Sequence, residues 1–275
     1  MNFVKYFVIK FFSRIVNLFW EILPLGIKVL FLNKKVTGIL DYSKRKLTLV
    51  VSSQVSFQRL NSCKKEPETV TWICSNLEPS GVFYDIGANT GSYSLVAATL
   101  LNNEGRVVSF EPVPSTFIEL CQNIQINGMS NSITPINIPL SEENSISKFG
   151  LNSFMGGVGM HMGISKELMH SNSDQTIFHY LVKTQTLDSV VKEFELPLPS
   201  IMKIDVDGPE FQILKGASNV LKNNKLKSLQ IEIDQVNQPI SEIVLFLEAH
   251  GLILKEKHKH GESDILDFVF YRLKN

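Results

Sequence analysis

The chain has 275 residues, of which 44% are hydrophobic and 20% are charged, and its 27 basic side chains balance 27 acidic ones. This apolar composition excludes an intrinsically disordered chain, and 11 prolines and 16 glycines without a period exclude a collagen-like one. A net charge of zero argues against a dedicated nucleic-acid-binding protein, since contacts to phosphates need a basic surface. The length suits one domain of roughly 200–250 residues with an appendage.

The charge is unevenly distributed along the chain. Residues 1–36 carry six basic side chains and one acidic one, so this segment has a charge of +5 and the remainder has −5. Such asymmetry suggests a segment with a partner of its own. We divide the chain into a basic helical leader (1–36), a lead-in of strand and helix (37–78) and a main domain (79–275).

The leader has the pattern of an amphipathic helix. Polar side chains such as Lys10 and Arg14 recur on one helical face, and Pro24 and Gly26 then interrupt the helix. The opposite face is apolar and carries Phe3, Phe7, Phe11, Ile15, Leu18, Phe19 and Ile22. The leader therefore fits an interfacial helix.

Three placements of the leader remain open. A helix lying in a membrane surface fits best, because its basic face suits anionic lipids. Packing on the domain or on a second subunit is the alternative. A transmembrane span needs roughly 18 apolar residues with few charges and is interrupted here by Lys10, Arg14 and Glu21. A secretory signal peptide would need a small-residue cleavage site, which the sequence lacks.

Cysteine usage indicates the compartment. Cys63, Cys74 and Cys121 form no CxxC pair. An odd and sparse set of this kind is typical of reduced thiols. We expect a cytoplasmic protein, with the inner face of the membrane as the site of leader attachment.

Strand and helix patterns alternate from about residue 66. The expected strands are 82–86, 106–110, 133–139, 200–206, 228–234 and 266–273. The expected helices start at Pro67, cover 91–101 and 115–127 with Ser115 as the cap, start again at Pro209, and cover 242–250. This alternation predicts an α/β fold with a doubly wound, mostly parallel sheet, in which ligands bind beyond the carboxyl ends of the strands.

The first strand leads into a glycine turn. The segment is Asp85-Ile86-Gly87-Ala88-Asn89-Thr90-Gly91. Its two glycines allow a tight turn, but the GxGxxG motif of dinucleotide sites is absent, and the Asp85 carboxylate would oppose a pyrophosphate. The turn suits a cationic ligand without phosphate, such as S-adenosylmethionine, with a generic strand-to-helix turn as the alternative. Glu111 ends the next strand, 26 residues after Asp85, where a carboxylate can accept hydrogen bonds from ribose hydroxyls.

Four segments together resemble the FkbM-type methyltransferases of the class I S-adenosylmethionine-dependent superfamily. They are VFYDIGANTGSYSLVA, RVVSFEPVPSTFIELCQNIQING, KTQTLDSVV and IMKIDVDGPEFQILKGA. The resemblance implies a seven-stranded, Rossmann-like sheet closed by an antiparallel strand, which 266–273 fits. It also implies a cofactor site in which Asp85, Gly87, Asn89 and Gly91 line the methionine part, Glu111 holds the ribose, and Pro112, Leu140 and Ser141 flank the adenine.

Three acids at the end of the strand at 200–206 and directly after it are the catalytic candidates. They are Asp205, Asp207 and Glu210, in a VDGPE segment where the family usually has VEGAE, so that the acid at 207 is one methylene shorter. Asp205 or Asp207 could remove the proton of an acceptor hydroxyl. Glu210 alternatively stabilises a helix N-terminus through the helix dipole.

Two further candidates remain open. A divalent cation such as Mg²⁺ could lower the pKa of the acceptor hydroxyl, held by Asp205 with Glu232 or Asp234. His161 lies in a glycine-rich stretch (154–163) that is either a substrate lid, with His161 as general base, or a plain flexible hairpin.

We therefore expect an S-adenosylmethionine-dependent methyltransferase that methylates a hydroxyl of a sugar, a glycan or a secondary metabolite, at the membrane surface if the leader binds there. We expect no nucleic-acid partner, and the sequence leaves the oligomeric state open. An NAD-dependent oxidoreductase on a related fold and a non-catalytic membrane-docked module are the alternatives.

Overall fold

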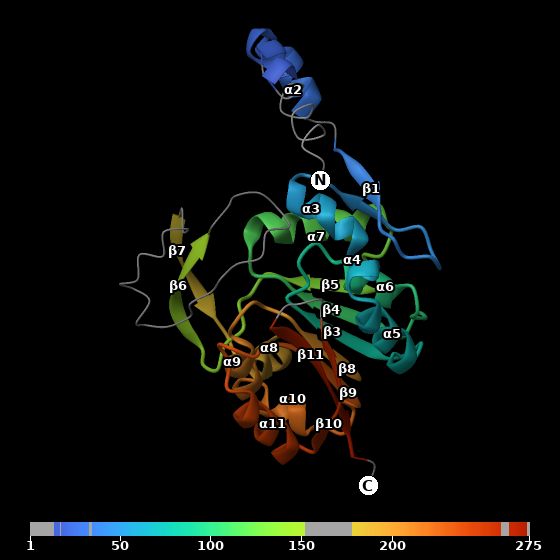
Figure 1. Ribbon diagram of the computed structural model, residues 1–275, viewed down its shortest axis with the longest axis vertical. Coiled ribbons are helices and arrows are strands. Elements are labelled where there is room, and N and C mark those ends of the chain that lie inside the picture. Colours follow the sequence, from blue (N-terminus) through green and yellow to red (C-terminus); the bar gives the residue numbers. More distant parts are fainter. Residues whose placement is uncertain (1–13, 17, 33–34, 152–177, 260–263, 274–275) are drawn as a thin grey trace. The chain divides into compact units, whose positions relative to one another are not determined.

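The computed structural model describes residues 14–16, 18–32, 35–151, 178–259 and 264–273. The chain divides into two units, Met1–Val36 and Thr37–Asn275, which are described separately (Figure 1). The apolar residues expected at positions 3, 7 and 11 of the leader, and the candidate base His161, lie outside the described residues.

The first unit is helical where it is described. Residues 14–16 and 18–22 are helical, the helix is interrupted at Leu23 and Pro24, and α2 (Leu25–Leu32) follows. The break expected at Pro24 is thus confirmed. In the described part of the chain, no helix combines the length and the apolar character that crossing a membrane requires.

The second unit is built on a seven-stranded sheet with the order β10-β11-β9-β8-β3-β4-β5. Its strands are β3 (Val82–Ile86), β4 (Arg106–Phe110), β5 (Ile133–Ile136), β8 (Ile201–Ile204), β9 (Ser228–Asp234), β10 (Leu252–Lys259) and β11 (Ile265–Arg272). β11 is antiparallel to both of its neighbours, whereas β5, β4, β3, β8 and β9 pair in parallel. The expected sheet, with its antiparallel closing strand, is confirmed.

Helices cover both faces of this sheet (Figure 1). They are α5 (Pro67–Asn76), α6 (Ser92–Ala98), α7 (Pro114–Ile126), α8 (Leu187–Glu193), α9 (Glu210–Lys215), α10 (Ser218–Lys222) and α11 (Ile240–Ala249). One hydrophobic core packs side chains of α8 to α11 against the sheet, and a second packs α5, α6 and α7 on the other face. The fold is therefore doubly wound, and the strand order reverses between β3 and β8, where such sheets bind their ligands.

The lead-in lies against α6 and α7. It contains β1 (Thr37–Ile39), β2 (Thr48–Val50), α3 (Gln54–Gln58), the 3₁₀ turn η1 (Arg59–Asn61) and α4 (Ser62–Lys65). The backbone N–H of Val50 donates to Asn123 Oδ1 of α7 at 2.7 Å, and Tyr93 Oη of α6 lies 3.2 Å from the carbonyl oxygen of Ser62. These contacts place the lead-in beside the helix that follows the glycine turn.

Three details of the structure differ from the expectation. Val113, rather than Ser115, is the N-cap of α7, because Pro114 occupies the first helical position, where a missing N–H is tolerated. The helix expected from Pro209 is divided into α9 and α10 near Gly216, where a side-chain Cβ would lie 2.1 Å from the carbonyl oxygen of Ser141. A hairpin of β6 (Ser145–Leu151) and β7 (Phe178–Thr184) stands outside the central sheet.

Candidate cofactor and methyl-transfer site

The glycine turn after β3 has a backbone that few residue types tolerate. Gly87 and Gly91 have φ values of +83° and +88°, and Asn89 has +50°. A Cβ at Gly87 would lie 1.8 Å from the carbonyl oxygen of Asp205, so only glycine allows this turn to touch the end of β8. Gly91 caps α6, which runs away from the turn.

Asp85 is fully buried behind this turn. Ser94 Oγ donates to its Oδ2 at 2.5 Å, whereas its Oδ1 has no hydrogen-bond partner among the described residues. Burial raises the pKa of Asp85 against the opposing charge of Lys203. The unpaired oxygen leaves this carboxyl able to accept one more hydrogen bond.

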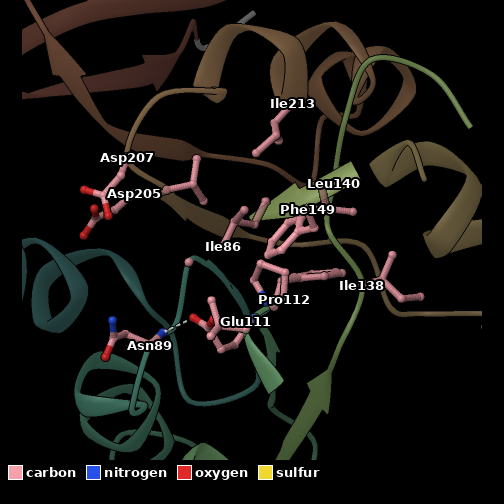
Figure 2. Close-up of a pocket in the computed structure, with 14 residues that line it drawn as sticks. Ile86, Asn89, Glu111, Pro112, Ile138, Leu140, Phe149, Asp205, Asp207 and Ile213 are labelled. Carbon is pink, nitrogen blue, oxygen red and sulfur yellow. Dashed lines mark hydrogen bonds between the residues drawn. The ribbon is translucent and has the colours of Figure 1, made fainter. Parts of the chain in front are cut away.

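A cavity opens at the carboxyl ends of β3, β4 and β8 (Figure 2). It has an empty volume of about 560 Å³, part of which is open to solvent. Its lining residues are Ile86, Gly87, Asn89, Phe110, Glu111, Pro112, Val113, Ile138, Leu140, Phe149, Asp205, Val206, Asp207 and Ile213. Beyond Gly87 and Asn89 of the turn, the lining includes the predicted site residues Glu111, Pro112, Leu140, Asp205 and Asp207.

Glu111 is the polar anchor of this cavity. Its Oε2 accepts a hydrogen bond from the backbone N–H of Asn89 at 2.9 Å, and its Oε1 accepts one from Val113 at 2.9 Å. Burial raises the pKa of Glu111 to about 7, although these two N–H groups oppose the shift. The carboxyl group is therefore fixed in orientation and can accept hydrogen bonds from ribose hydroxyls when it is ionised.

The far end of the cavity is an apolar slot. Pro112, Ile138, Leu140 and Phe149 form its walls, and Figure 2 shows them grouped away from the acidic end. Phe149 comes from β6 and packs on Tyr180 of β7, with ring centroids 5.4 Å apart. Such a slot suits a flat heterocycle such as adenine.

Three predicted cofactor residues do not line this cavity, namely Asp85, Gly91 and Ser141. Asp85 lies buried behind the turn, and Gly91 ends the turn as the N-cap of α6. The backbone N–H of Ser141 donates to the carbonyl oxygen of Gln185 at 2.9 Å, and Leu140 beside it supplies the wall.

At the opposite end, Asp205 is held by a buried lysine. Lys203 Nζ lies 2.6 Å from Asp205 Oδ2, and the lysine side chain is 3% exposed. Burial alone would raise the pKa of Asp205, but the charge of Lys203 outweighs it and holds that pKa below its usual value. Burial, followed by the charge of Asp205, raises the pKa of Glu232 to about 9. At neutral pH Asp205 is therefore ionised and Glu232 is protonated.

Asp207 stands between two cavities. It lines the one described above and also a second one, with an empty volume of about 710 Å³ that is partly open to solvent. The second cavity is lined by Asp207, Gly208, Glu210, Glu232, Asp234, Asn237, Gln238 and Ile265. Asp207 has a φ of +58°, which turns its side chain beside that of Asp205 (Figure 2).

Carboxylate oxygens of Asp205, Asp207 and Glu232 lie within 4.8 Å of one another. Such a group can share protons or hold a divalent cation. Of the two partners considered for Asp205, Glu232 is the one in this group. Asp234 instead accepts hydrogen bonds from the Val236 N–H at 2.9 Å and from Asn237 Nδ2 at 2.7 Å.

Glu210 is 1% exposed and holds the turn that carries Asp207. Its Oε1 accepts the Gly208 N–H at 2.9 Å, and its Oε2 accepts a hydrogen bond from Gln238 Nε2. These contacts, at the first residue of α9, favour the structural alternative for Glu210 over direct catalysis.

Sequence reasoning missed the cation at this centre. Burial would lower the pKa of Lys203, but Asp205, Asp85 and Glu66 together raise it above its usual value. Glu66, from the lead-in, is itself buried and accepts a hydrogen bond from Tyr93 Oη at 2.6 Å. The signal for Lys203 was available, since a lysine within the four buried residues of β8 needs buried partners.

Comparisons with known proteins agree with this geometry. The family described as "Methyltransferase FkbM domain" matches residues 85–254. The chain belongs to the FkbM methyltransferase family. A hexuronic acid methyltransferase, AglP, of Haloferax volcanii is 28% identical over 174 residues, which are 63% of this chain and 65% of that protein. The chain thus spans less than two thirds of that relative's length.

Solved structures provide a second comparison. A methyltransferase FkbM of Methylobacillus flagellatus is 15% identical, with a TM-score of 0.49, over 79% of this chain and 52% of that one. The methyltransferase domain of METTL16 is 14% identical, with a TM-score of 0.46, over 81% of this chain and 70% of that one.

The residues of this FkbM-family chain fit S-adenosylmethionine. Glu111 is positioned to accept hydrogen bonds from ribose hydroxyls, the apolar slot suits adenine, and the acidic end at Asp205 and Asp207 suits a cation. The absence of a third glycine and the buried acid at Asp85 disfavour a dinucleotide.

Proposed function

We propose that this protein is an S-adenosylmethionine-dependent O-methyltransferase whose acceptor is a hydroxyl of a sugar or glycan. The observation that carries the proposal is the position of Asp207, whose side chain lines both cavities and lies beside the ionised Asp205. The relative named as a hexuronic acid methyltransferase supports a sugar acceptor.

The two cavities have different tasks in this proposal. The first binds the cofactor, which supplies an electrophilic methyl group on a sulfonium. Glu111 orients the ribose, and Phe149, Pro112 and Leu140 enclose the adenine. The second cavity binds the acceptor, because a polyhydroxyl compound can donate several hydrogen bonds to its carboxylate and amide oxygens.

Asp207 acts as the general base. It takes the hydroxyl proton as the new carbon–oxygen bond forms and the carbon–sulfur bond breaks, so the negative charge lost at the carboxylate matches the positive charge lost at sulfur. Asp205 stays ionised through Lys203 and favours the cationic ligand near it. Most of the remaining rate enhancement comes from aligning the hydroxyl with the methyl group.

A divalent cation offers a second route to the same proton transfer. Asp205, Asp207 and Glu232 would hold Mg²⁺ through oxygen atoms, and the metal would lower the pKa of a bound hydroxyl. The two routes differ measurably: with a bound metal, EDTA abolishes activity and Mg²⁺ restores it, whereas with Asp207 alone EDTA has no effect.

We propose that the leader binds the inner face of the cytoplasmic membrane, which would bring the domain to lipid-linked glycans. The basic, apolar-faced pattern of residues 1–36 supports this, and the three unpaired cysteines support a cytoplasmic setting.

The test is a transfer assay with labelled S-adenosylmethionine and a panel of acceptors. The panel holds glycans that contain uronic acids, neutral glycans and their lipid-linked forms, and products are identified by the mass of one added methylene. Methylation of a hydroxyl in any member supports the proposal. Calorimetric binding of NAD in place of S-adenosylmethionine would refute it and favour the oxidoreductase. Cofactor binding without transfer to any acceptor would favour the non-catalytic module.

A further inference from the structure

Arg59 has no place in the site described above, although the lead-in holds it firmly. It opens η1, directly after α3, whose first turn is closed by a capping box between Ser53 and Ser56. The carbonyl oxygen of Arg59 accepts hydrogen bonds from the backbone N–H and, at 2.8 Å, from the hydroxyl of Ser62. The backbone that carries Arg59 is therefore fixed.

Contacts with α6 hold η1 and the residues after it near the helix that follows the glycine turn. Tyr93, the second residue of α6, places its hydroxyl 3.2 Å from the Ser62 carbonyl oxygen and 2.6 Å from Glu66 Oε2. Since α6 begins immediately after Gly91, the end of η1 lies beside the first turn of the helix that follows the glycine turn.

The guanidinium of Arg59 has a hydrogen-bond donor without an acceptor. Its Nε is buried without a hydrogen-bond partner, and within the described residues the side chain forms no salt bridge. A buried guanidinium donor without an acceptor is unfavourable, so a ligand that supplies an acceptor gains affinity.

The charge of Arg59 also acts on the first cavity. Burial raises the pKa of Glu111, and Arg59 is among the groups that oppose the rise. This effect agrees with the contact between Ser62 and Tyr93, which places the end of η1 beside the first turn of α6.

We propose that Arg59 binds the α-carboxylate of S-adenosylmethionine. The inference rests on the proposed function. Within the cofactor, the ammonium and the sulfonium are cationic and suit the acids around Asp205, and the ribose suits Glu111. The carboxylate is the remaining group and would be repelled by those acids. Arginine is the side chain whose planar fork of donors matches a carboxylate.

Calorimetry with two cofactor forms tests this assignment on the full chain. S-adenosylmethionine and its decarboxylated analogue are titrated into the wild type, Arg59→Met, Arg59→Lys and the matched control Arg45→Met. Arg45 is an exposed arginine of the same lead-in. We expect the wild type to bind the carboxylated form about 10- to 100-fold more tightly, since one charge-assisted pair contributes on this order.

The expected variant pattern is specific. Arg59→Met loses that preference by weakening only the carboxylated form, Arg59→Lys keeps part of it, and Arg45→Met keeps all of it. Equal affinity of the wild type for both forms overturns the inference without needing any variant. Equal weakening of both forms in a folded Arg59→Met protein also overturns it, and would make Arg59 a structural counter-ion. If the wild type binds neither form, the proposed function fails as well.

Discussion

The burial of Glu111 makes cofactor affinity depend on pH. The carboxyl has a pKa of about 7, raised by burial from an ordinary 4.5, and ribose hydroxyls can donate to it fully only when it is ionised. Below pH 7 the free protein must release this proton on binding. The affinity should therefore rise with pH by up to about ten-fold per unit until pH 7, and level off above it.

The raised pKa of Glu111 has the opposite effect on the stability of the unliganded protein, which should fall as the pH rises. Between pH 4.5 and about 7 the folded state keeps a proton that the unfolded chain has lost, so the free energy of unfolding falls as the pH rises. A shift of this size corresponds to about 3 kcal/mol across the window. Glu111→Gln cannot titrate and should lack this contribution.

Two measurements check the reasoning. S-adenosylhomocysteine binding is measured by calorimetry from pH 5.5 to 8 for the wild type and for Glu111→Gln. The difference between the two proteins cancels the titration of the ligand itself. Urea unfolding over the same range gives the stability difference. Glu119→Gln is the matched control for the binding measurement, because Glu119 is equally buried but accepts a hydrogen bond from Ser52 and does not line the cavity. Identical pH slopes for the wild type and Glu111→Gln would refute the argument.

Three further outcomes are expected. Gly87→Ala should abolish S-adenosylhomocysteine binding and lower the melting temperature, because its Cβ would lie 1.8 Å from the Asp205 carbonyl oxygen. The control Gly128→Ala, with φ +67° and open space around it, should lower the free energy of unfolding in urea by only about 1 kcal/mol. Asp207→Asn should lower kcat by about 10²–10⁴-fold with S-adenosylhomocysteine affinity unchanged by calorimetry, since asparagine tolerates φ +58°; an unaltered kcat would exclude Asp207 as the base. Deleting residues 1–36 should keep the melting temperature and cofactor affinity but remove flotation with anionic vesicles, and retained flotation would contradict the role given to the leader.

The central strands could be predicted from sequence because their burial is uniform. β3, β4 and β9 have the expected bounds, since each is a short run rich in β-branched and aromatic or aliphatic residues and is buried over most of its length. β10 was missed because it is an edge strand, and an edge tolerates the exposed, charged second half of LILKEKHK. The β6–β7 hairpin was missed because Phe149 is the only residue of β6 that the structure shows as buried among those whose burial it describes, and because its partner strand is distant in sequence.

The cofactor site was predicted in outline, because strand ends and a glycine turn are local features. Gly87, Asn89, Glu111, Pro112, Asp205 and Asp207 line one cavity, and the roles given to them stay predictions. Phe149 lines the cavity from the β6–β7 hairpin, which only the tertiary fold brings there. Lys203 and Arg59 come from a buried strand and from the lead-in. No local motif indicates Phe149 or Arg59, because their neighbours at the site are far away in sequence, whereas a lysine inside the buried run of β8 was a local signal for Lys203.

The contact of Gly87 with the Asp205 carbonyl oxygen constrains how this family member can diverge. Because the cofactor turn and the acidic turn touch through backbone atoms, a change that reshapes residues 205–208 must also displace the cofactor turn. The second cavity has a further wall, at Asn237 and Ile265, that belongs to neither of these two turns. New acceptor specificities should therefore evolve, or be engineered, on that wall.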